Sequence, residues 1–242
     1  QAEDKGDHYL INGQKIWTTM AHDATHIFML VRTDPDAPKK QQGISFVLAR
    51  MDQPSVDVRT ITTLAGETEF CEVFFDNART PRANLVGEIN KGWSMAKALL
   101  SFERIFIGSP GLAQNALGQL ETFARGRGAF DDPVFRDRYA EAALDVEDHA
   151  ALYSRFADQL KRGETLGADV SMLKIWVTET YQRISELMIE VAGPDGGSIG
   201  PLQVGNVGVD VLASFYKARP TTIYGGSNEI QRNILSKAVL GL

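Results

Sequence analysis

The order of apolar and polar positions divides the chain near residue 90. Before it, short apolar runs rich in Val, Ile, Phe and Thr alternate with turn signals, a pattern typical of β-strands. The predicted strands are residues 9–11, 15–17, 27–32, 44–49, 56–63 and 71–76. Asn12-Gly13 between the first two predicts a hairpin turn. Strands at this spacing without helices between them predict an antiparallel sandwich or barrel.

After Gly92 the apolar positions repeat with a helical period. The predicted helices are residues 93–124, 133–162, 168–192 and 209–216, and one from after Gly226 to Val239. Pro110 predicts a kink in the first of them near residues 108–111. The predicted fold is therefore α+β, with a β-domain at residues 1–88 followed by an up-down four-helix bundle at residues 89–242.

Composition narrows the class of protein. The 242 residues are 43% hydrophobic and 23% charged, which is ordinary for a globular protein. The net charge of −6 does not indicate the basic surface that nucleic-acid binding requires. No apolar run approaches the roughly 18–20 residues that span a bilayer. The single cysteine, Cys71, excludes a disulfide framework within the chain. The chain begins at Gln1 with a polar stretch unlike a targeting peptide, so we expect a cut inside a longer, cytoplasmic protein.

Most familiar catalytic motifs are missing from the sequence. It has no HExxH, no GxSxG and no Walker loop, and its four histidines show no metal-ligand spacing, so we expect no metal site. The glycine cluster at residues 193–197 follows a helix rather than a strand, which favours a helix C-cap over a dinucleotide fingerprint.

The segment Tyr224-Gly225-Gly226-Ser227-Asn228-Glu229-Ile230-Gln231 carries more information. Its two glycines allow a ligand to approach the backbone, and Ser227 or Asn228 can cap the helix that follows. Asn228 with Gln231 resembles a capping box. Free N–H groups at such a helix end attract anionic or carbonyl oxygens. A plain capped helix explains the pattern equally well.

Two further features have both a structural and a functional interpretation. Trp17-Thr18-Thr19 suits a planar ring with polar edges, although the pattern favours a core tryptophan with surface threonines. Glu103-Arg104 interrupts an apolar helix. It is either a salt bridge or solvated stripe, or a carboxylate made more basic by burial and poised as a catalytic base.

Four segments taken together, in order along the whole chain, resemble the acyl-CoA dehydrogenases. They are residues 12–19 (NGQKIWTT), 127–130 (RGAF), 193–196 (GPDG) and 224–232 (YGGSNEIQR). The match covers the middle β-domain and the C-terminal helical domain of that family. The family's first flavin-binding loop and N-terminal helical domain would lie upstream of Gln1. Lys91-Gly92-Trp93 is most similar to bacterial members that act on dicarboxyl, branched or ring-bearing acyl-CoAs.

The resemblance implies non-covalent FAD and oxidation of an acyl-CoA thioester to the 2,3-enoyl-CoA, with an α-proton taken by a glutamate and a β-hydride passed to flavin N5. Trp17 and Thr19 match residues on the flavin, and Arg127 matches one on the pyrophosphate of a neighbouring subunit's FAD. The full set of matched FAD contacts is Trp17, Thr19, Arg127, Phe130, Gly193, Ser227 and Glu229.

The catalytic base requires a choice between two positions used in the family. Many members carry the glutamate directly after the tyrosine of the terminal motif, where this chain has Gly225. Others, similar to isovaleryl-CoA and long-chain dehydrogenases, place it before an arginine on the first long helix, and Glu103-Arg104 matches that place. We therefore assign the base to Glu103 and the donor to the thioester carbonyl to the Gly225 N–H.

The resemblance also implies substrate contacts at Phe102, Arg104, Tyr224 and Gly226. An electron-transferring flavoprotein would accept the electrons, and a homodimer or homotetramer would share the FAD site. Arg138 and Glu190 depart from the family, because many members have FAD-contacting glutamines there. These departures leave open a non-catalytic or partner subunit of a heteromeric acyl-CoA dehydrogenase. Another flavin reaction, such as monooxygenation, is a third possibility.

Overall fold

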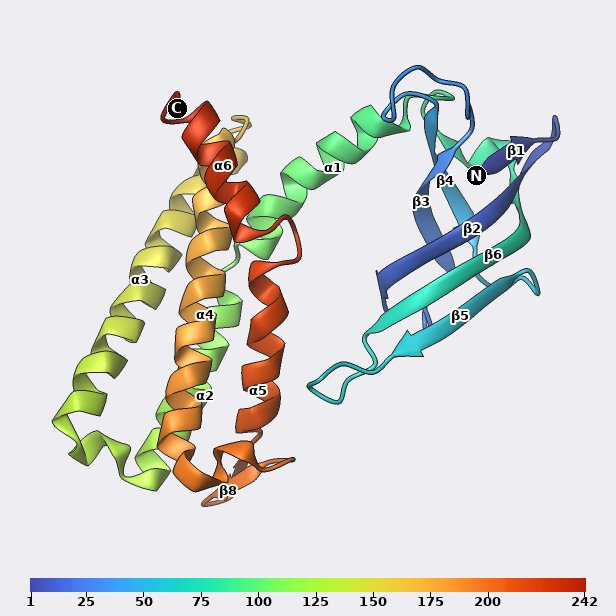
Figure 1. The fold of residues 1–242 in the computed structure, drawn as a ribbon. Helices are drawn as coiled ribbons and strands as arrows, with labels where there is room; N and C mark the ends of the chain where they lie inside the picture. The colour runs from blue at the N-terminus through green and yellow to red at the C-terminus, as the bar shows by residue number, and fades with distance from the viewer. The chain divides into compact units, whose positions relative to one another are not determined.

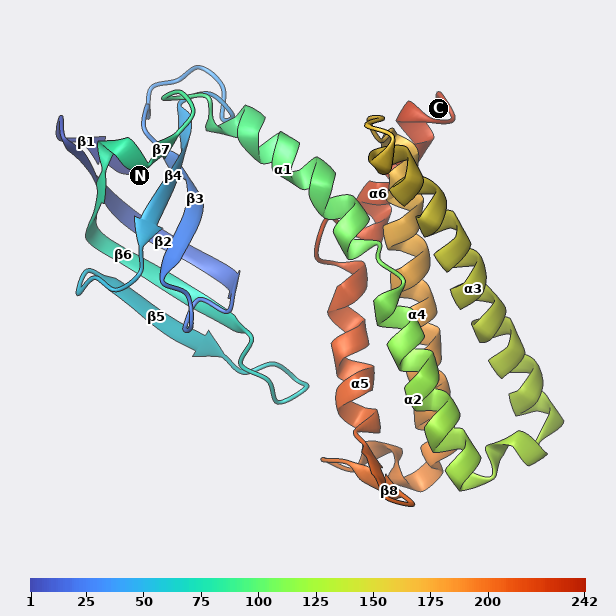
Figure 2. The same ribbon diagram turned by 180° about the vertical axis from the view of Figure 1, so that it is seen from behind.

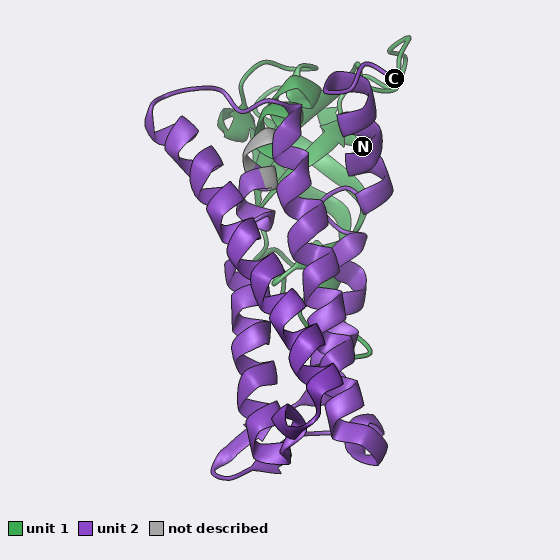
Figure 3. Ribbon diagram, turned by 90° about the vertical axis from the view of Figure 1, so that its left-hand side faces the viewer, with its two compact units in different colours: residues 1–100 green, residues 101–242 purple. Residues whose placement is uncertain are grey.

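We analysed a computed structural model of the chain, which describes residues 1–100, 103 and 105–242 (Figures 1 and 2). The chain divides into two compact units, residues 1–100 and residues 101–242 (Figure 3). The first unit is built of antiparallel strands and the second of helices, so the predicted α+β class is confirmed. No helix in the described part of the chain is long and apolar enough to cross a membrane.

The first unit holds two antiparallel sheets, with strand orders β1-β2-β6-β5 and β3-β4-β7. The strands are β1 (Ala2–Asp4), β2 (His8–Thr19), β3 (His26–Arg32), β4 (Ile44–Arg50), β5 (Val56–Ile61), β6 (Phe70–Pro81) and β7 (Leu85–Val86). Alternate residues point inward, so that Val47, Ala49 and Val73 are fully buried between the sheets. The described strands form a sandwich and do not close into a barrel.

The predicted hairpin at Asn12-Gly13 is wrong. β2 runs through these residues without reversing, and its pairing with β6 shifts register between Ile11 and Gly13. The Asn12 amide donates to Asn77 Oδ1 (3.1 Å) and its Oδ1 accepts from the Asn77 N–H (2.8 Å). A β-bulge bonded across to the neighbouring strand has therefore taken the place of the turn that this dipeptide favours in isolation.

The second unit is the predicted helical bundle, in which α2 to α5 lie side by side (Figures 1 and 2). α1 (Gly92–Ile107) begins in the first unit and ends in the second. The helices that lie wholly in the second unit are α2 (Gly111–Arg127), α3 (Pro133–Lys161), α4 (Ser171–Ala192), α5 (Val211–Ala218) and α6 (Asn228–Ala238). A small hairpin, β8 (Leu202–Val204) and β9 (Val207–Val209), precedes α5. Leu120 and Phe123 of α2 and Ile184 of α4 are fully buried in the bundle core.

The first predicted helix is two helices rather than one kinked helix. α1 ends at Ile107 and α2 begins at Gly111, with Pro110 at the N-cap of α2. Pro110 has no N–H to donate to the carbonyl of Phe106, and its ring would clash with that carbonyl in a continuing helix. The sequence located the disruption, and the proline separates the two helices completely.

A buried lysine joins α4 to α6. Lys174 is 1% exposed, and its ammonium donates to Asn228 Oδ1 at 2.6 Å. Among the described residues it forms no ion pair with a carboxylate. Burial lowers the pKa of Lys174 from 10.5 to about 8, although the negative charges of Glu229 and Glu179 oppose that shift. The contact between these helices therefore includes a cation withdrawn from water.

We predict that this cation makes the stability of the protein depend on pH. Between pH 8 and 10.5 the unfolded chain holds the Lys174 proton more tightly than the folded protein does, so the free energy of unfolding rises with pH. Relative to Lys174→Met, the wild type should gain on the order of 2 kcal/mol between pH 7 and pH 10. Urea unfolding of both proteins across this range measures the gain.

Ser171→Ala is the matched control, because it removes a buried hydroxyl of the same helix without changing charge. Its difference from the wild type should stay constant with pH. A pH-independent difference for Lys174→Met would show that Lys174 keeps its ordinary pKa in the folded protein.

Candidate active site

The turn before α6 presents two free backbone donors. Gly225 and Gly226 have φ of 65° and 82°, a left-handed conformation that favours glycine. Among the described residues neither N–H donates a hydrogen bond. The Gly225 carbonyl, by contrast, accepts from Gln231 Nε2 at 3.0 Å. Two unpaired donors at the positive end of a helix form a site suited to a negatively charged or carbonyl oxygen.

The side chains after the turn are arranged differently from the predicted capping box. Ser227 is the N-cap of α6, and its Oγ accepts from the Ile230 N–H at 3.4 Å. Asn228 is buried against α4, and Gln231 reaches back to Gly225, so these two do not form a reciprocal pair. The hydroxyl of Ser227 holds the pKa of the Glu229 carboxyl below its usual range, with a smaller effect from the helix-end N–H. Glu229 is therefore an anion at physiological pH.

The end of α1 lies against the terminal turn. A Cβ added to Gly225 would lie 2.4 Å from Cδ1 of Ile107, so that side chain fills the space a larger residue would need. Glu103 is half-buried and lies one turn before Ile107 on the same face of α1. The structure thus places Glu103 on the face of α1 that meets Gly225. The predicted substrate contacts Phe102 and Arg104 lie outside the described residues, whereas Tyr224 is 42% exposed beside Gly225.

A second group of predicted residues lies at the other end of α4. The Arg127 guanidinium forms an ion pair with Asp195 at 3.0 Å and lies over the Phe123 ring. Gly193, with φ of 56°, ends α4 and begins the loop that carries Asp195. Phe130 packs edge-on against two neighbouring rings and is partly buried. Within one subunit, Arg127 therefore contacts the loop that begins at Gly193. These residues lie at the opposite end of α4 from the terminal turn.

Arg138 and Glu190, which we expected to depart from the family, pair with each other. Both guanidinium nitrogens of Arg138 donate to the two carboxylate oxygens of Glu190. This ion pair compensates the negative charge that Glu190 would otherwise present to an anionic ligand. Because both side chains are about half exposed, the pair contributes little to stability.

Trp17 and Thr19 belong to the first unit, at the end of β2. The pattern favoured a core tryptophan, and this is wrong, because Trp17 is 61% exposed and contacts Phe70 edge-on at 6.1 Å. Its φ of 60° is a left-handed conformation, which is costly for a residue with a side chain. Trp17 lies within the register shift between Lys15 and Thr18 in the pairing of β2 with β6, and such a bulge redirects a side chain.

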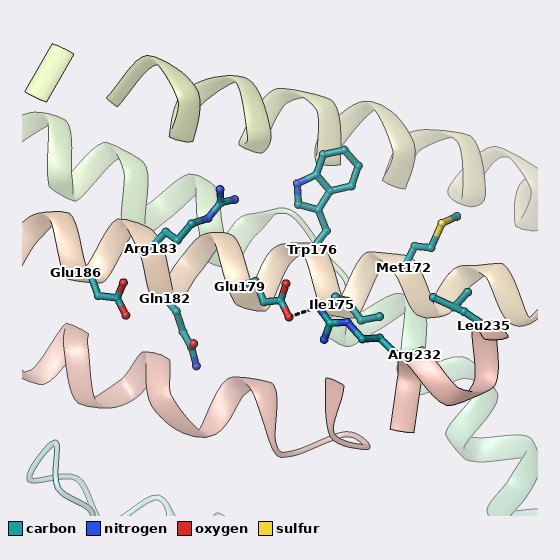
Figure 4. A pocket seen from close by; sticks show the side chains of 9 residues that line it. All are labelled: Met172, Ile175, Trp176, Glu179, Gln182, Arg183, Glu186, Arg232 and Leu235. Atoms are coloured by element: carbon teal, nitrogen blue, oxygen red, sulfur yellow. Dashed lines mark hydrogen bonds and ion pairs between the residues drawn. The ribbon is translucent and has the colours of Figure 1, made fainter. Parts of the chain in front are cut away.

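The helical unit also has a surface groove that the sequence analysis did not find (Figure 4). Its volume is about 730 Å³, and Glu179 and Arg232 form an ion pair across its wall at 2.7 Å. The lining residues are Met172, Ile175, Trp176, Glu179, Gln182, Arg183, Glu186, Arg232 and Leu235. Trp176 among charged residues on the outer face of α4 was the signal available. None of the predicted site residues lines this groove.

Comparisons with known proteins agree along the whole chain. The acyl-CoA dehydrogenase middle domain matches residues 1–78 and the acyl-CoA dehydrogenase C-terminal domain matches residues 90–240. The chain is 36% identical over 244 residues to acyl-CoA dehydrogenase IpdE1 of Mycobacterium tuberculosis, covering 100% of this chain and 61% of that protein. It spans less than two thirds of the length of such relatives.

Solved structures give the same result for the fold. The steroid acyl-CoA dehydrogenase Tcur3481-Tcur3483 is similar with a TM-score of 0.89 and 28% identity, over 100% of this chain and 63% of that one. The ChsE4-ChsE5 complex of Mycobacterium tuberculosis is similar with a TM-score of 0.83 and 27% identity, over 100% of this chain and 64% of that one. The chain therefore belongs to the acyl-CoA dehydrogenases, a family of flavoprotein oxidoreductases of acyl-CoA degradation.

Proposed function

We propose that the chain carries the flavin- and substrate-binding residues of an FAD-dependent acyl-CoA dehydrogenase, which converts an acyl-CoA thioester to the 2,3-enoyl-CoA. In this proposal residues 1–88 form one wall of the FAD and substrate site, and residues 89–242 supply the base, further FAD contacts and the oligomer interface. The observation that carries it is the terminal turn: among the described residues the N–H groups of Gly225 and Gly226 donate no hydrogen bond, and Gly225 lies against Ile107 of the helix that bears Glu103.

The Gly225 N–H donates to the thioester carbonyl in this mechanism. Removal of the α-proton shifts negative charge onto that oxygen, so a fixed donor there stabilises the transition state more than the ground state. The donor is backbone, and Gln231 holds the carbonyl of the same residue, so the donor is oriented before substrate binds. Tyr224 and Gly226 flank the position and would contact the acyl group.

Glu103 takes the α-proton. The carboxylate becomes a carboxylic acid as the C–H bond breaks, while the β-carbon loses a hydride and the double bond forms between the two carbons. Gly225 carries no carboxylate, so in this proposal the base comes from another element, and Ile107, one turn after Glu103, lies against Gly225. We therefore propose that α1 supplies the base.

The residues present fit FAD. Arg127 is a cation held at the surface by Asp195 and suited to a pyrophosphate, and the Arg138–Glu190 pair removes an unfavourable negative charge. The exposed, strained Trp17 with Thr19 would contact the flavin ring, and Phe130, Gly193, Ser227 and Glu229 would complete the contacts. When bound, FAD supplies the acceptor for the hydride.

The remaining proposals follow from the family. Electrons would leave through an electron-transferring flavoprotein in the bacterial cytoplasm. Arg127 and the terminal turn lie at opposite ends of α4, which favours FAD sites shared between the subunits of a homodimer or homotetramer. Because a similar structure is a steroid acyl-CoA dehydrogenase, we propose a ring-bearing acyl group. A panel of linear, branched and ring-bearing CoA esters with a dye acceptor tests this.

We predict that Glu103→Gln abolishes catalysis and leaves the fold intact. The amide has almost the same shape as the carboxylate but cannot accept the α-proton. Anaerobic mixing of the full-length variant with substrate should bleach the flavin at least about 1,000-fold more slowly than in the wild type.

Glu121→Gln is a control for the loss of one carboxylate, since Glu121 pairs with Arg125 on the exposed side of α2. It should bleach at the wild-type rate. Equal rates for Glu103→Gln and the wild type would exclude Glu103 as the base.

A second candidate is a non-catalytic or partner subunit of a heteromeric enzyme. It is favoured because two similar structures carry paired names, Tcur3481-Tcur3483 and the ChsE4-ChsE5 complex. In a heteromer of this kind the chain could support the active site of its partner in a heterotetramer.

Flavin content separates the two candidates. We predict that the full-length wild type purifies alone with one FAD per subunit, measured by visible absorbance against protein concentration. Arg127→Ala should lose at least half of that flavin on gel filtration, because the pyrophosphate loses its cation. Arg155→Ala, on α3, should retain it. Flavin-free wild type that gains FAD and activity with a second chain would favour the partner subunit.

A further inference from the structure

We propose that Lys174 is a positioning residue for the reaction: through Asn228 it holds the terminal turn so that the Gly225 and Gly226 N–H groups face the thioester oxygen. The inference rests on the proposed function, and it adds a residue of α4 that lies outside all the predicted contacts with FAD or substrate.

The contacts form a short chain from α4 to the turn. The Lys174 ammonium donates to Asn228 Oδ1 at 2.6 Å. The Asn228 amide donates back to α4, to Thr178 Oγ1 at 3.1 Å and to Glu179 Oε1 at 3.1 Å. Asn228 is 2% exposed and is the first residue of α6. Both the oxygen and the nitrogen of its side-chain amide are hydrogen-bonded to residues of α4. The turn, Gly225 and Gly226, ends two residues before Asn228.

These hydrogen bonds are important for the turn because its own backbone provides little rigidity. Two consecutive glycines are the most flexible pair a chain can contain, and ordering them costs conformational entropy. Gln231 holds the carbonyl of Gly225 from the α6 side. Lys174 and Thr178 fix the start of α6 from the α4 side. We propose that these contacts, from the α6 side and from the α4 side, together fix the direction of the free N–H groups.

Packing does not explain why the residue that holds Asn228 is a cation. A fully buried ammonium without a carboxylate partner costs several kcal/mol, and a methionine would fill a similar volume. The positive end of the α6 dipole lies at the same place, which adds repulsion to that cost. An anionic oxygen at the turn would be attracted by both positive charges.

The experiment compares Lys174→Met with the wild type in the full-length, flavin-loaded protein. We expect kcat per bound flavin to fall about 10–100-fold, while KM changes less than about threefold, because the lost alignment affects the transition state. A purely structural defect would lower the amount of loaded enzyme and leave kcat per flavin unchanged. Amide hydrogen exchange over residues 230–235 should accelerate about tenfold or more as the start of α6 loosens.

Two further variants make the result specific. Ser171→Ala removes another buried polar group of α4 and should change neither the exchange of α6 nor kcat per flavin. Asn228→Ala should reproduce the loss, and the double variant with Lys174→Met should be no worse than the more damaging single variant, since the two residues act as one unit. Losses that multiply independently would contradict the proposed chain of contacts.

The outcomes separate this inference from the proposed function. Wild-type flavin that no acyl-CoA ester bleaches would remove the proposed function, and this inference with it. Wild-type flavin that substrate bleaches, together with unchanged kcat per flavin and unchanged α6 exchange in Lys174→Met, would overturn the positioning role and leave the function standing.

Discussion

The contact between α4 and α6 is the constraint on which the rest of the site depends. Many residues of α4 are buried in the bundle. Asn228 bonds the start of α6 to that helix. The glycine turn directly precedes this attachment. In the proposed mechanism this contact lets a flexible segment present backbone donors with the fixed geometry that catalysis requires.

The end of α1 borders the same turn. α1 ends at Ile107, before Pro110, and the Ile107 side chain lies beside Gly225. Glu103 lies one turn earlier on that face of α1. This packing is what makes α1 the proposed source of the base in a chain that has a glycine at position 225.

The features that the sequence predicted are those governed by local rules. Apolar periodicity located the long helices and most strands, and Ser227, one of the two caps that the sequence allowed, is the N-cap of α6. The failures were tertiary. Asn12-Gly13 became a bulge because a distant strand bonded to it, and Trp17 is exposed at a strained backbone position that no pattern reveals. Lys174 was missed because a lysine in a helix is usually assigned to the surface.

Two charges in the bundle compensate each other. The Arg138 guanidinium and the Glu190 carboxylate meet in a bidentate pair. Either charge alone would change the potential where an anionic cofactor is proposed to bind, whereas both together leave it nearly neutral. Lys174 differs, because no carboxylate among the described residues bonds to it directly, although the charges of Glu229 and Glu179 act on it from nearby. This buried cation beside the glycine turn is the basis for proposing that negative charge develops there.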